Sequence, residues 1–259
     1  MELQLCKIER LGGHLELLSG LRIGASEGEI RIGGVDNQVI RHPHTGHPYI
    51  PGSSLKGKVR SLLEWLSGAV KERPLSYQDL DNRTPLVKPI LQLFGVGGGD
   101  RLTDEVAKKL GIELRDLTGD HGLADAAAAK LGPTRLAFWD APLNEEWRKE
   151  VEADNNLLVE VKTENRIDRI RGVAEHPRQS ERVPAGATFD FTVSIKVLNI
   201  DAEDGGELRR VLYRGLRLLE LDSLGGSGSR GYGKVKFRDL QLDGEPVQAE
   251  FEALDPFSA

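Results

Sequence analysis

The chain has 259 residues, a formal net charge of −6 and 39% hydrophobic residues, which is typical of a soluble globular protein with one large domain. Cys6 is the only cysteine, so an intramolecular disulfide and a zinc site built from several thiolates are excluded. No apolar run approaches the roughly 20 residues that span a bilayer, and the N-terminus lacks the apolar stretch of a signal peptide. We therefore expect a cytoplasmic protein with no membrane partner.

The charges are unevenly distributed along the chain. Residues 52–60 contain three basic residues and residues 225–238 contain four, with no acidic residue in either stretch. Residues 239–259 contain six acidic residues and no Lys or Arg. A local basic stripe can bind phosphate even when the chain is acidic on average, so nucleic acid is not excluded as a partner.

The first predicted elements are a strand and a helix. Rough alternation of apolar and polar residues predicts a strand over 4–19, bent near Gly12 and Gly13. After a glycine-rich segment and a proline-bounded loop, Ser53 or Ser54 can cap a helix that ends near Gly68. Its apolar face consists of Leu55, Val59, Leu62, Leu63 and Leu66.

The middle of the chain is weakly patterned. Residues 71–132 contain short helical pieces at 102–110 and 123–131, and we expect them to form an insertion lying over the core. Strand character returns at 134–139, and Asn144 can cap a short helix that runs to residue 152. Residues 157–161 are typical of the stem of an arm, whereas 162–184 are polar, charged and unperiodic.

The last third of the chain carries the clearest periodicities. Residues 188–197 alternate as a strand, 203–222 have the spacing of an amphipathic helix, and a Gly/Ser loop leads into a strand over 234–242. Without insertions the order is strand, helix, strand, strand, helix, strand. This order predicts an α+β fold with a ferredoxin-like, RNA-recognition-type core, in which both helices cover one face of an antiparallel sheet.

The segment PGSSLKGKVR (51–60) combines a tight turn with the start of a helix. The free N–H groups of the first turn and the positive end of the helix dipole form an anion site. Lys56 and Arg60 are four residues apart, so they share a helix face and can follow one phosphate backbone. A solvated basic face on an amphipathic helix is the alternative interpretation.

The loop GGSGSRGYGK (225–234) contains the letters of two nucleotide-binding motifs, G-x-G-x-x-G and G-x-x-x-x-G-K. Both motifs require a strand, then the loop, then a helix, whereas this loop follows a helix and enters a strand. Val235 also stands where the second motif needs Ser or Thr. What remains is a backbone that can approach RNA closely, with Arg230 for a phosphate and Tyr232 for a base or sugar face.

Five segments resemble the RAMP superfamily and, within it, the backbone subunit of the type III-A (Csm) CRISPR effector complex. They are GLRIG (20–24), IGGVDNQVIR (32–41), PYIPGSSLKGKVR (48–60), KTENRIDR (162–169) with ERVPAG (181–186), and the loop GGSGSRGYG (225–233). The segments follow the family's order over most of the chain. The region 71–132 matches poorly.

The resemblance implies a single RAMP domain over 1–259, with 71–132 as a lid and 162–184 as a thumb-like hairpin. It implies partners: a CRISPR guide RNA, a target RNA, further copies of the chain in a helical filament, and other Csm subunits, including the small subunit and the large polymerase-like subunit. It also implies that the thumb pushes through the guide–target duplex and displaces a nucleotide. The expected RNA-binding residues are Arg22, Ser53, Ser54, Lys56, Lys58, Arg60, Arg166, Ile167, Arg169, Arg171, Gly226, Arg230 and Tyr232.

The resemblance assigns cleavage of the target RNA to Asp36, which would also be the protein ligand of Mg²⁺ or another divalent cation. The implied chemistry is attack of the target's own 2′-hydroxyl on the neighbouring phosphate, leaving a 2′,3′-cyclic phosphate. By itself, an Asp-Asn pair after two glycines is a turn. The alternatives are a purely structural guide-binding subunit and the sister subunit of the type III-B complex. The cluster of His42, His44 and His47 is interpreted as a loop surface, and its metal binding stays open.

Overall fold

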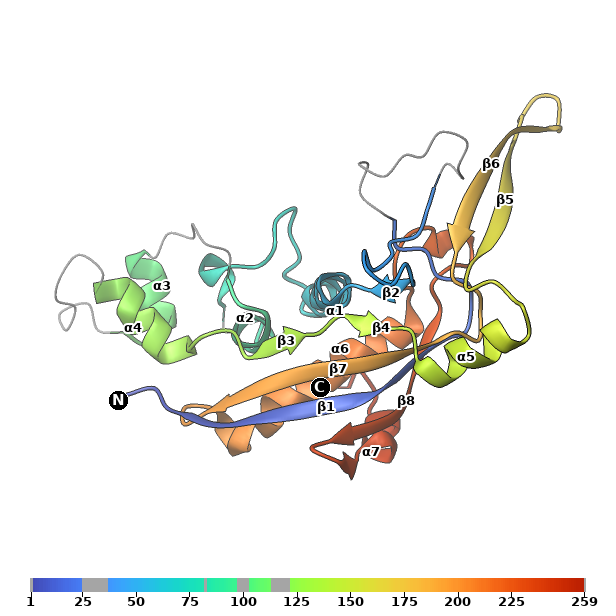
Figure 1. Ribbon diagram of the computed structural model, residues 1–259. Coiled ribbons are helices and arrows are strands. Elements are labelled where there is room, and N and C mark those ends of the chain that lie inside the picture. The colour runs from blue at the N-terminus through green and yellow to red at the C-terminus, as the bar shows by residue number, and fades with distance from the viewer. Residues whose placement is uncertain (1, 25–36, 82, 97–102, 113–121, 259) are drawn as a thin grey trace.

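The computed structural model describes residues 2–24, 37–81, 83–96, 103–112 and 122–258 (Figure 1). Its strands are β1 (Leu5–Leu17), β2 (Tyr49–Ile50), β3 (Leu136–Phe138), β4 (Ala141–Pro142), β5 (Glu160–Ile167), β6 (Ala174–Arg182), β7 (Thr188–Leu198), β8 (Val235–Leu242) and β9 (Glu245–Pro246). Its α-helices are α1 (Gly52–Leu66), α2 (Val87–Phe94), α3 (Asp104–Lys109), α4 (Gly122–Leu131), α5 (Glu145–Ala153), α6 (Gly206–Leu221) and α7 (Gln248–Ala253). Among the described residues, no helix is both long enough and apolar enough to cross a membrane.

The main sheet has five antiparallel strands in the order β3-β7-β1-β8-β9. Helix α1 lies between β1 and β3 in the chain, and α6 lies between β7 and β8. The predicted α+β class with an antiparallel sheet is therefore confirmed. Figure 1 shows β1 and β7 running side by side along the body of the molecule.

The predicted bend in the first strand lies where the register between β1 and β8 shifts, between Gly12 and His14. Gly13 has φ +158°, and a Cβ atom built on it would lie 2.7 Å from the carbonyl oxygen of Arg238. A side chain at this position would therefore push β8 away, which explains the glycine.

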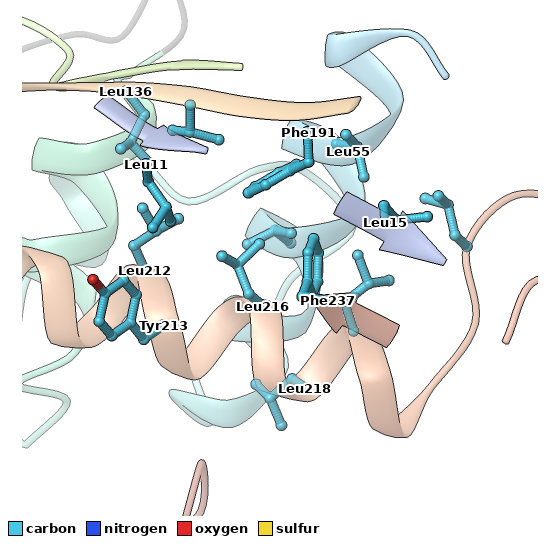
Figure 2. Packing of buried hydrophobic residues seen from close by; sticks show 14 of the residues in the cluster. Leu11, Leu15, Leu55, Leu136, Phe191, Leu212, Tyr213, Leu216, Leu218 and Phe237 are labelled. Carbon is cyan, nitrogen blue, oxygen red and sulfur yellow. The ribbon is translucent and has the colours of Figure 1, made fainter. Parts of the chain in front are cut away.

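The core lies between one face of the sheet and helices α1 and α6 (Figure 2). The alternating apolar residues of β7 are all buried, as predicted, and Phe191 meets Phe237 of β8 edge to face with ring centroids 4.8 Å apart. Leu212 and Leu216 of α6 are fully buried beneath them. Burial of each such side chain contributes roughly 1.5–3 kcal/mol to folding.

Helices α1 and α6 approach each other closely at a glycine. A Cβ atom on Gly215 of α6 would lie 2.6 Å from Val59 and 2.9 Å from Leu63, both on α1. Leu55, Val59 and Leu63 of the predicted apolar face are fully buried. Any larger residue at position 215 would separate the two helices.

The region 71–132 is not uniform. Helix α2, which the sequence pattern did not predict, packs Val87, Ile90 and Leu93 into the main core with no exposed surface. Helices α3 and α4 overlap the two predicted helical pieces and enclose a separate small cluster that includes Ala107 and Ala127. Part of the predicted insertion is thus integral to the core, and its treatment as a separate lid stays a prediction.

A buried ion pair joins the start of β3 to the segment that follows β7. Arg135, next to β3, and Asp201, after β7, have fully buried side chains joined by Nη2–Oδ1 and Nε–Oδ2 hydrogen bonds of 2.7 and 3.0 Å. Asp201 Oδ2 also accepts the backbone N–H of Leu198 at 2.8 Å. Because each charge is compensated only by the other, the pair ties β3 to the β7–α6 connection.

Strands β5 and β6 pair as an antiparallel hairpin that projects from the body of the molecule (Figure 1). We call this hairpin the thumb. Its turn is closed by Asp168, whose Oδ1 accepts the backbone N–H groups of Ile170 and Arg171 at 2.7 and 2.8 Å. These two hydrogen bonds, that of Arg171 foremost, lower the pKa of Asp168. The unperiodic segment 162–184 therefore forms an ordered two-stranded arm.

Candidate nucleic-acid interface

The tip of the thumb presents cations and apolar side chains to solvent. Arg166, Ile167 and Arg169 are exposed. The guanidinium groups of the two arginines form no ion pair or hydrogen bond with any described residue. Arg171 lies 3.8 Å from Glu175, a loose contact between exposed side chains. Ile170 is 97% exposed at the turn. Exposed aliphatic side chains beside free guanidinium groups are typical of a surface that binds a partner.

The start of α1 differs from the prediction. Pro51 is the N-cap residue and no side chain caps the helix, so the serine cap predicted at Ser53 or Ser54 is wrong. The N–H of Gly52 donates instead to the carboxylate of Asp140 at 2.8 Å. A carboxylate thus occupies part of the anion site that the sequence predicted for a phosphate.

The three basic residues of α1 have different environments. Lys56 is half-buried and contacts no acidic residue in the described part of the chain, whereas Lys58 forms a 2.7 Å ion pair with Asp222 at the end of α6. Arg60 donates to Glu64 at 2.7 Å and to the carbonyl oxygens of Gly95 at 3.1 Å and Leu75 at 2.8 Å.

The prediction that Arg60 follows a phosphate backbone together with Lys56 is therefore corrected. All three of its nitrogen groups are engaged inside the protein, and only 16% of its side chain is exposed. Its binding partner Glu64 is buried and also accepts the N–H of Leu75 at 3.1 Å. Arg60 thus holds the chain after α1 to the helix, whereas Lys56 forms no ion pair with any residue that the structure describes.

The glycine loop 225–233 packs against the end of the first strand. The N–H of Gly226 donates to the carbonyl oxygen of Arg22 at 2.9 Å, and the N–H of Gly233 donates to that of Gly20 at 3.0 Å. A Cβ atom on Gly225, whose φ is +74°, would overlap the Arg22 carbonyl. Gly225 and Gly233 are therefore required for close packing of backbone on backbone, whereas a Cβ atom on Gly226 would lie 3.8 Å from the Arg22 carbonyl oxygen, an ordinary contact distance. Gly226 itself is exposed and stays available to a ligand.

Tyr232 is 1% exposed, so the prediction that it offers a face to a base or sugar is corrected. Its ring contacts two cations of the thumb, with Lys162 Nζ 4.5 Å and Arg182 Cζ 5.0 Å from the ring centroid. Burial, and then the charge of Glu164, raise the pKa of the Tyr232 phenol. Sequence reasoning missed this role, in which Tyr232 anchors the root of the thumb to the glycine loop.

Arg230 lies at the edge of the same contact. Its guanidinium is more than half exposed and its Nη1 lies 3.5 Å from Glu164 Oε2 of β5. An exposed pair at this distance is weak, so a phosphate could displace the carboxylate at little cost. Arg230 therefore remains suited to bind an anionic backbone.

The residue that follows Asp36 is held between the first strand and the thumb. Asp36 itself lies outside the described residues. Asn37 accepts a hydrogen bond from Arg22 Nη2 at 3.0 Å and bridges to Ser180 of β6. The Nε of Arg22 is buried without a hydrogen-bond partner among the described residues. The segment 20–24 that follows β1, the glycine loop, Asn37 and the root of the thumb therefore meet around Arg22.

The described residues contain no group of three or more His, Cys, Asp or Glu side chains that could hold a metal ion. His42 and His44 lie with ring centroids 5.7 Å apart, and His42 Nδ1 accepts the N–H of Thr45 at 3.4 Å. His42 and His44 therefore contribute to the structure of the loop before β2.

The comparison with known proteins agrees with this arrangement of segments. Residues 14–236 match the family model of the RAMP superfamily. A Methanocaldococcus jannaschii protein named CRISPR system Cms endoribonuclease Csm3 is 40% identical over 240 residues, which cover 92% of this chain and 82% of that protein. This chain belongs to the Csm3 family of the RAMP superfamily.

The Csm3 of Streptococcus thermophilus is 37% identical over 236 residues, which cover 90% of this chain and 88% of that protein. The crystal structure of Methanopyrus kandleri Csm3 is similar with a TM-score of 0.51 and 27% identity, over 92% of this chain and 78% of that structure. The predicted resemblance to the type III-A backbone subunit is thus confirmed, and the Csm3 relatives decide against the type III-B sister subunit.

Proposed function

We propose that this chain is a guide-RNA-binding backbone subunit of a type III-A CRISPR interference complex that also cleaves the paired target RNA. The observation that carries the proposal is the meeting of four family segments around Arg22: residues 20–24, Asn37 next to Asp36, the glycine loop and the thumb root. The Csm3 relatives, which match 90–92% of this chain, are named endoribonucleases.

We propose a ferredoxin-like core for the domain. The four strands that alternate with α1 and α6 occur in the sheet in the order β3-β7-β1-β8, so the first strand in the chain is central and the last pairs with it. This order and the burial of one sheet face under both helices support the assignment. On this basis 1–259 form one RAMP domain, with α3 and α4 as the lid.

The proposed RNA-binding surface consists mainly of cations that form no close ion pair with a described residue. Lys56, Arg230 and the thumb arginines Arg166, Arg169 and Arg171 would bind phosphates, since among the described residues no acidic group lies closer than 3.5 Å to any of these cations. The proposed interface also includes Arg22, Ser53, Ser54, Lys58 and Gly226, none of which is fully buried. Ile167 and Ile170 would pack against bases that the thumb separates.

The proposed cleavage reaction is attack of the target's 2′-hydroxyl on the adjacent phosphate, which forms a 2′,3′-cyclic phosphate and releases a 5′-hydroxyl. The attack needs near in-line geometry, which stacked A-form RNA denies and a nucleotide displaced by the thumb supplies. Asp36 would act in one of two ways, either by orienting this hydroxyl or by holding a divalent cation. A divalent cation such as Mg²⁺, when bound, would stabilise charge on the phosphate, with Asp36 as its protein ligand and RNA oxygens and water completing the shell.

The proposed partners are the guide RNA, the target RNA, further copies of the chain and the other Csm subunits, including the small and the large polymerase-like subunits. We propose that the complex acts in the cytoplasm.

Substitution of Asp36 by Ala in the assembled complex tests the enzymatic proposal. We expect guide RNA and target RNA to remain bound while cleavage is lost. Cleavage that persists at the wild-type rate would exclude Asp36 as the catalytic residue and favour the structural alternative. Removal of divalent cations with a chelator should stop cleavage of bound target without releasing the guide RNA, and unchanged cleavage would refute the cofactor proposal.

A further inference from the structure

The backbone that follows Asp36 is attached to two consecutive residues at the root of the thumb. The N–H of Glu181 donates to the carbonyl oxygen of Asn37 at 2.9 Å, and Ser180 pairs with Asn37 as a parallel bridge. The Asn37 amide also lies 3.5 Å from the Ser180 hydroxyl. A displacement of β6 at this point is therefore transmitted directly to Asn37.

The side chain of Glu181 extends this attachment along the segment. Its Oε2 accepts the N–H of Val39 at 2.9 Å, and its Oε1 accepts Arg41 Nη2 at 2.6 Å. Only 12% of the carboxylate side chain is exposed, and Val39 is buried. A short, charge-assisted pair in this setting holds its geometry more firmly than an exposed ion pair does. Residues 37, 39 and 41 are thus fixed by one thumb residue.

We propose that Glu181 is a positioning residue for cleavage, which couples the root of the thumb to the segment that carries Asp36. The inference rests on the proposed function and deepens it. Asp36 is bonded to Asn37, so the anchor lies one peptide unit from the proposed catalytic carboxylate. The same hairpin is proposed to displace the target nucleotide. Glu181 would therefore set the position of the carboxylate relative to the displaced nucleotide.

The chain offers a matched control within the same hairpin. Glu160 of β5 forms an ion pair with Arg182 at 2.6 Å, the same length as that between Glu181 and Arg41. Glu160 makes no described contact with residues 37–41. Loss of a carboxylate from the thumb root can therefore be separated from loss of the attachment to the Asp36 segment.

The test uses assembled complexes that carry Glu181→Ala, Glu181→Gln or Glu160→Ala. For Glu181→Ala we expect the single-turnover rate constant for cleavage of saturating target to fall by roughly 10- to 100-fold, as misplacement of a catalytic group by about 1 Å does. Guide retention and the Kd for target RNA should stay within about twofold of wild type, because phosphate contacts dominate affinity and Glu181 makes none. Glu160→Ala should cleave like wild type.

For Glu181→Gln we expect an intermediate rate of cleavage. Its amide oxygen can still accept the Val39 N–H, but it cannot form the charge-assisted pair with Arg41. We therefore expect a rate between those of wild type and Glu181→Ala, at unchanged Kd. A merely structural role predicts a different pattern, in which the rate follows guide retention and melting temperature.

Three outcomes overturn the inference: wild-type cleavage by Glu181→Ala, an equal loss in Glu160→Ala, or a rate loss fully explained by lost guide or target binding. The Asp36→Ala complex keeps this test separate from the proposed function. If Asp36→Ala abolishes cleavage while Glu181→Ala is normal, only the positioning role fails. If Asp36→Ala cleaves normally, the catalytic assignment itself fails.

Discussion

Substitution of Arg60 by Ala should destabilise the fold, although the sequence places this residue with Lys56 in a phosphate-binding stripe. The change removes hydrogen bonds to Glu64, Leu75 and Gly95 and leaves the buried carboxylate of Glu64 without its counter-charge. Breaking such a buried pair by removing one partner costs about 3–5 kcal/mol. At roughly 2–4 °C per kcal/mol for a chain of this size, the melting temperature should fall by about 6–20 °C.

The assay compares thermal unfolding and RNA binding of Arg60→Ala with those of the matched variant Lys56→Ala, four residues away on the same helix. Lys56 has no internal acidic partner among the described residues, so its removal should leave the melting temperature within about 2 °C of wild type. It should weaken RNA binding and reduce the slope of log Kd against log salt by about 0.7–0.9.

The reverse pattern would refute this reasoning. If Arg60→Ala melted like wild type and lost RNA affinity with a smaller salt slope, its guanidinium would have to be free for phosphate. If Lys56→Ala changed neither affinity nor salt dependence, the basic face of α1 would not contact RNA.

Three further predictions concern the fold around the interface. Arg135→Met should lower the free energy of unfolding, measured by urea titration, by about 3–5 kcal/mol, because the charge of Asp201 stays buried without its partner. The double variant Arg135→Met with Asp201→Leu should regain most of the lost stability. The turn amides bonded to Asp168 should lose protection from hydrogen exchange as the pH falls below 3.8. The pKa of Asp168 is lower in the folded protein than in the unfolded chain, so its carboxylate stabilises the turn fully above the unfolded-state pKa. This stabilisation is lost as the pH falls through the folded-state pKa. Gly52→Ala should cost about 1–3 kcal/mol, measured by the same urea titration, since its Cβ would overlap the Phe138 carbonyl.

The elements with long, regular patterns could be predicted from the sequence. The strand over 188–197 and the helix over 203–222 agree with β7 and α6 to within a few residues, because their buried faces alternate or repeat without interruption. Helix α2 was missed because it has only eight residues and contains Pro89, a residue that a first helical turn tolerates but that masks the pattern. Its burial depends on α1 and α6, which lie far from it in the sequence.

The individual roles at the interface were harder to predict than its location. The segments around Arg22 were identified from the sequence, and the structure brings them together. Which cations remain free depended on partners distant in the chain, such as Asp222 for Lys58 and Leu75 for Arg60. The burial of Tyr232 follows from the packing of the thumb root against the glycine loop, for which the spacing of residues gives no local signal.

The free cations suggest why a subunit with a net charge of −6 would bind RNA as part of a filament. Lys58 and Arg60 are neutralised internally, so Lys56, Arg230 and the thumb arginines carry the proposed phosphate contacts. About five contacts to a single strand correspond to a salt slope of only about −3.5 per subunit, and hence to weak binding by one copy at physiological salt. Copies joined side by side would add their contacts along one strand, and the effective concentration of each next site would raise the affinity of the array. On the proposed function, weak binding by each copy and firm binding by the array would then both result from the same charge distribution.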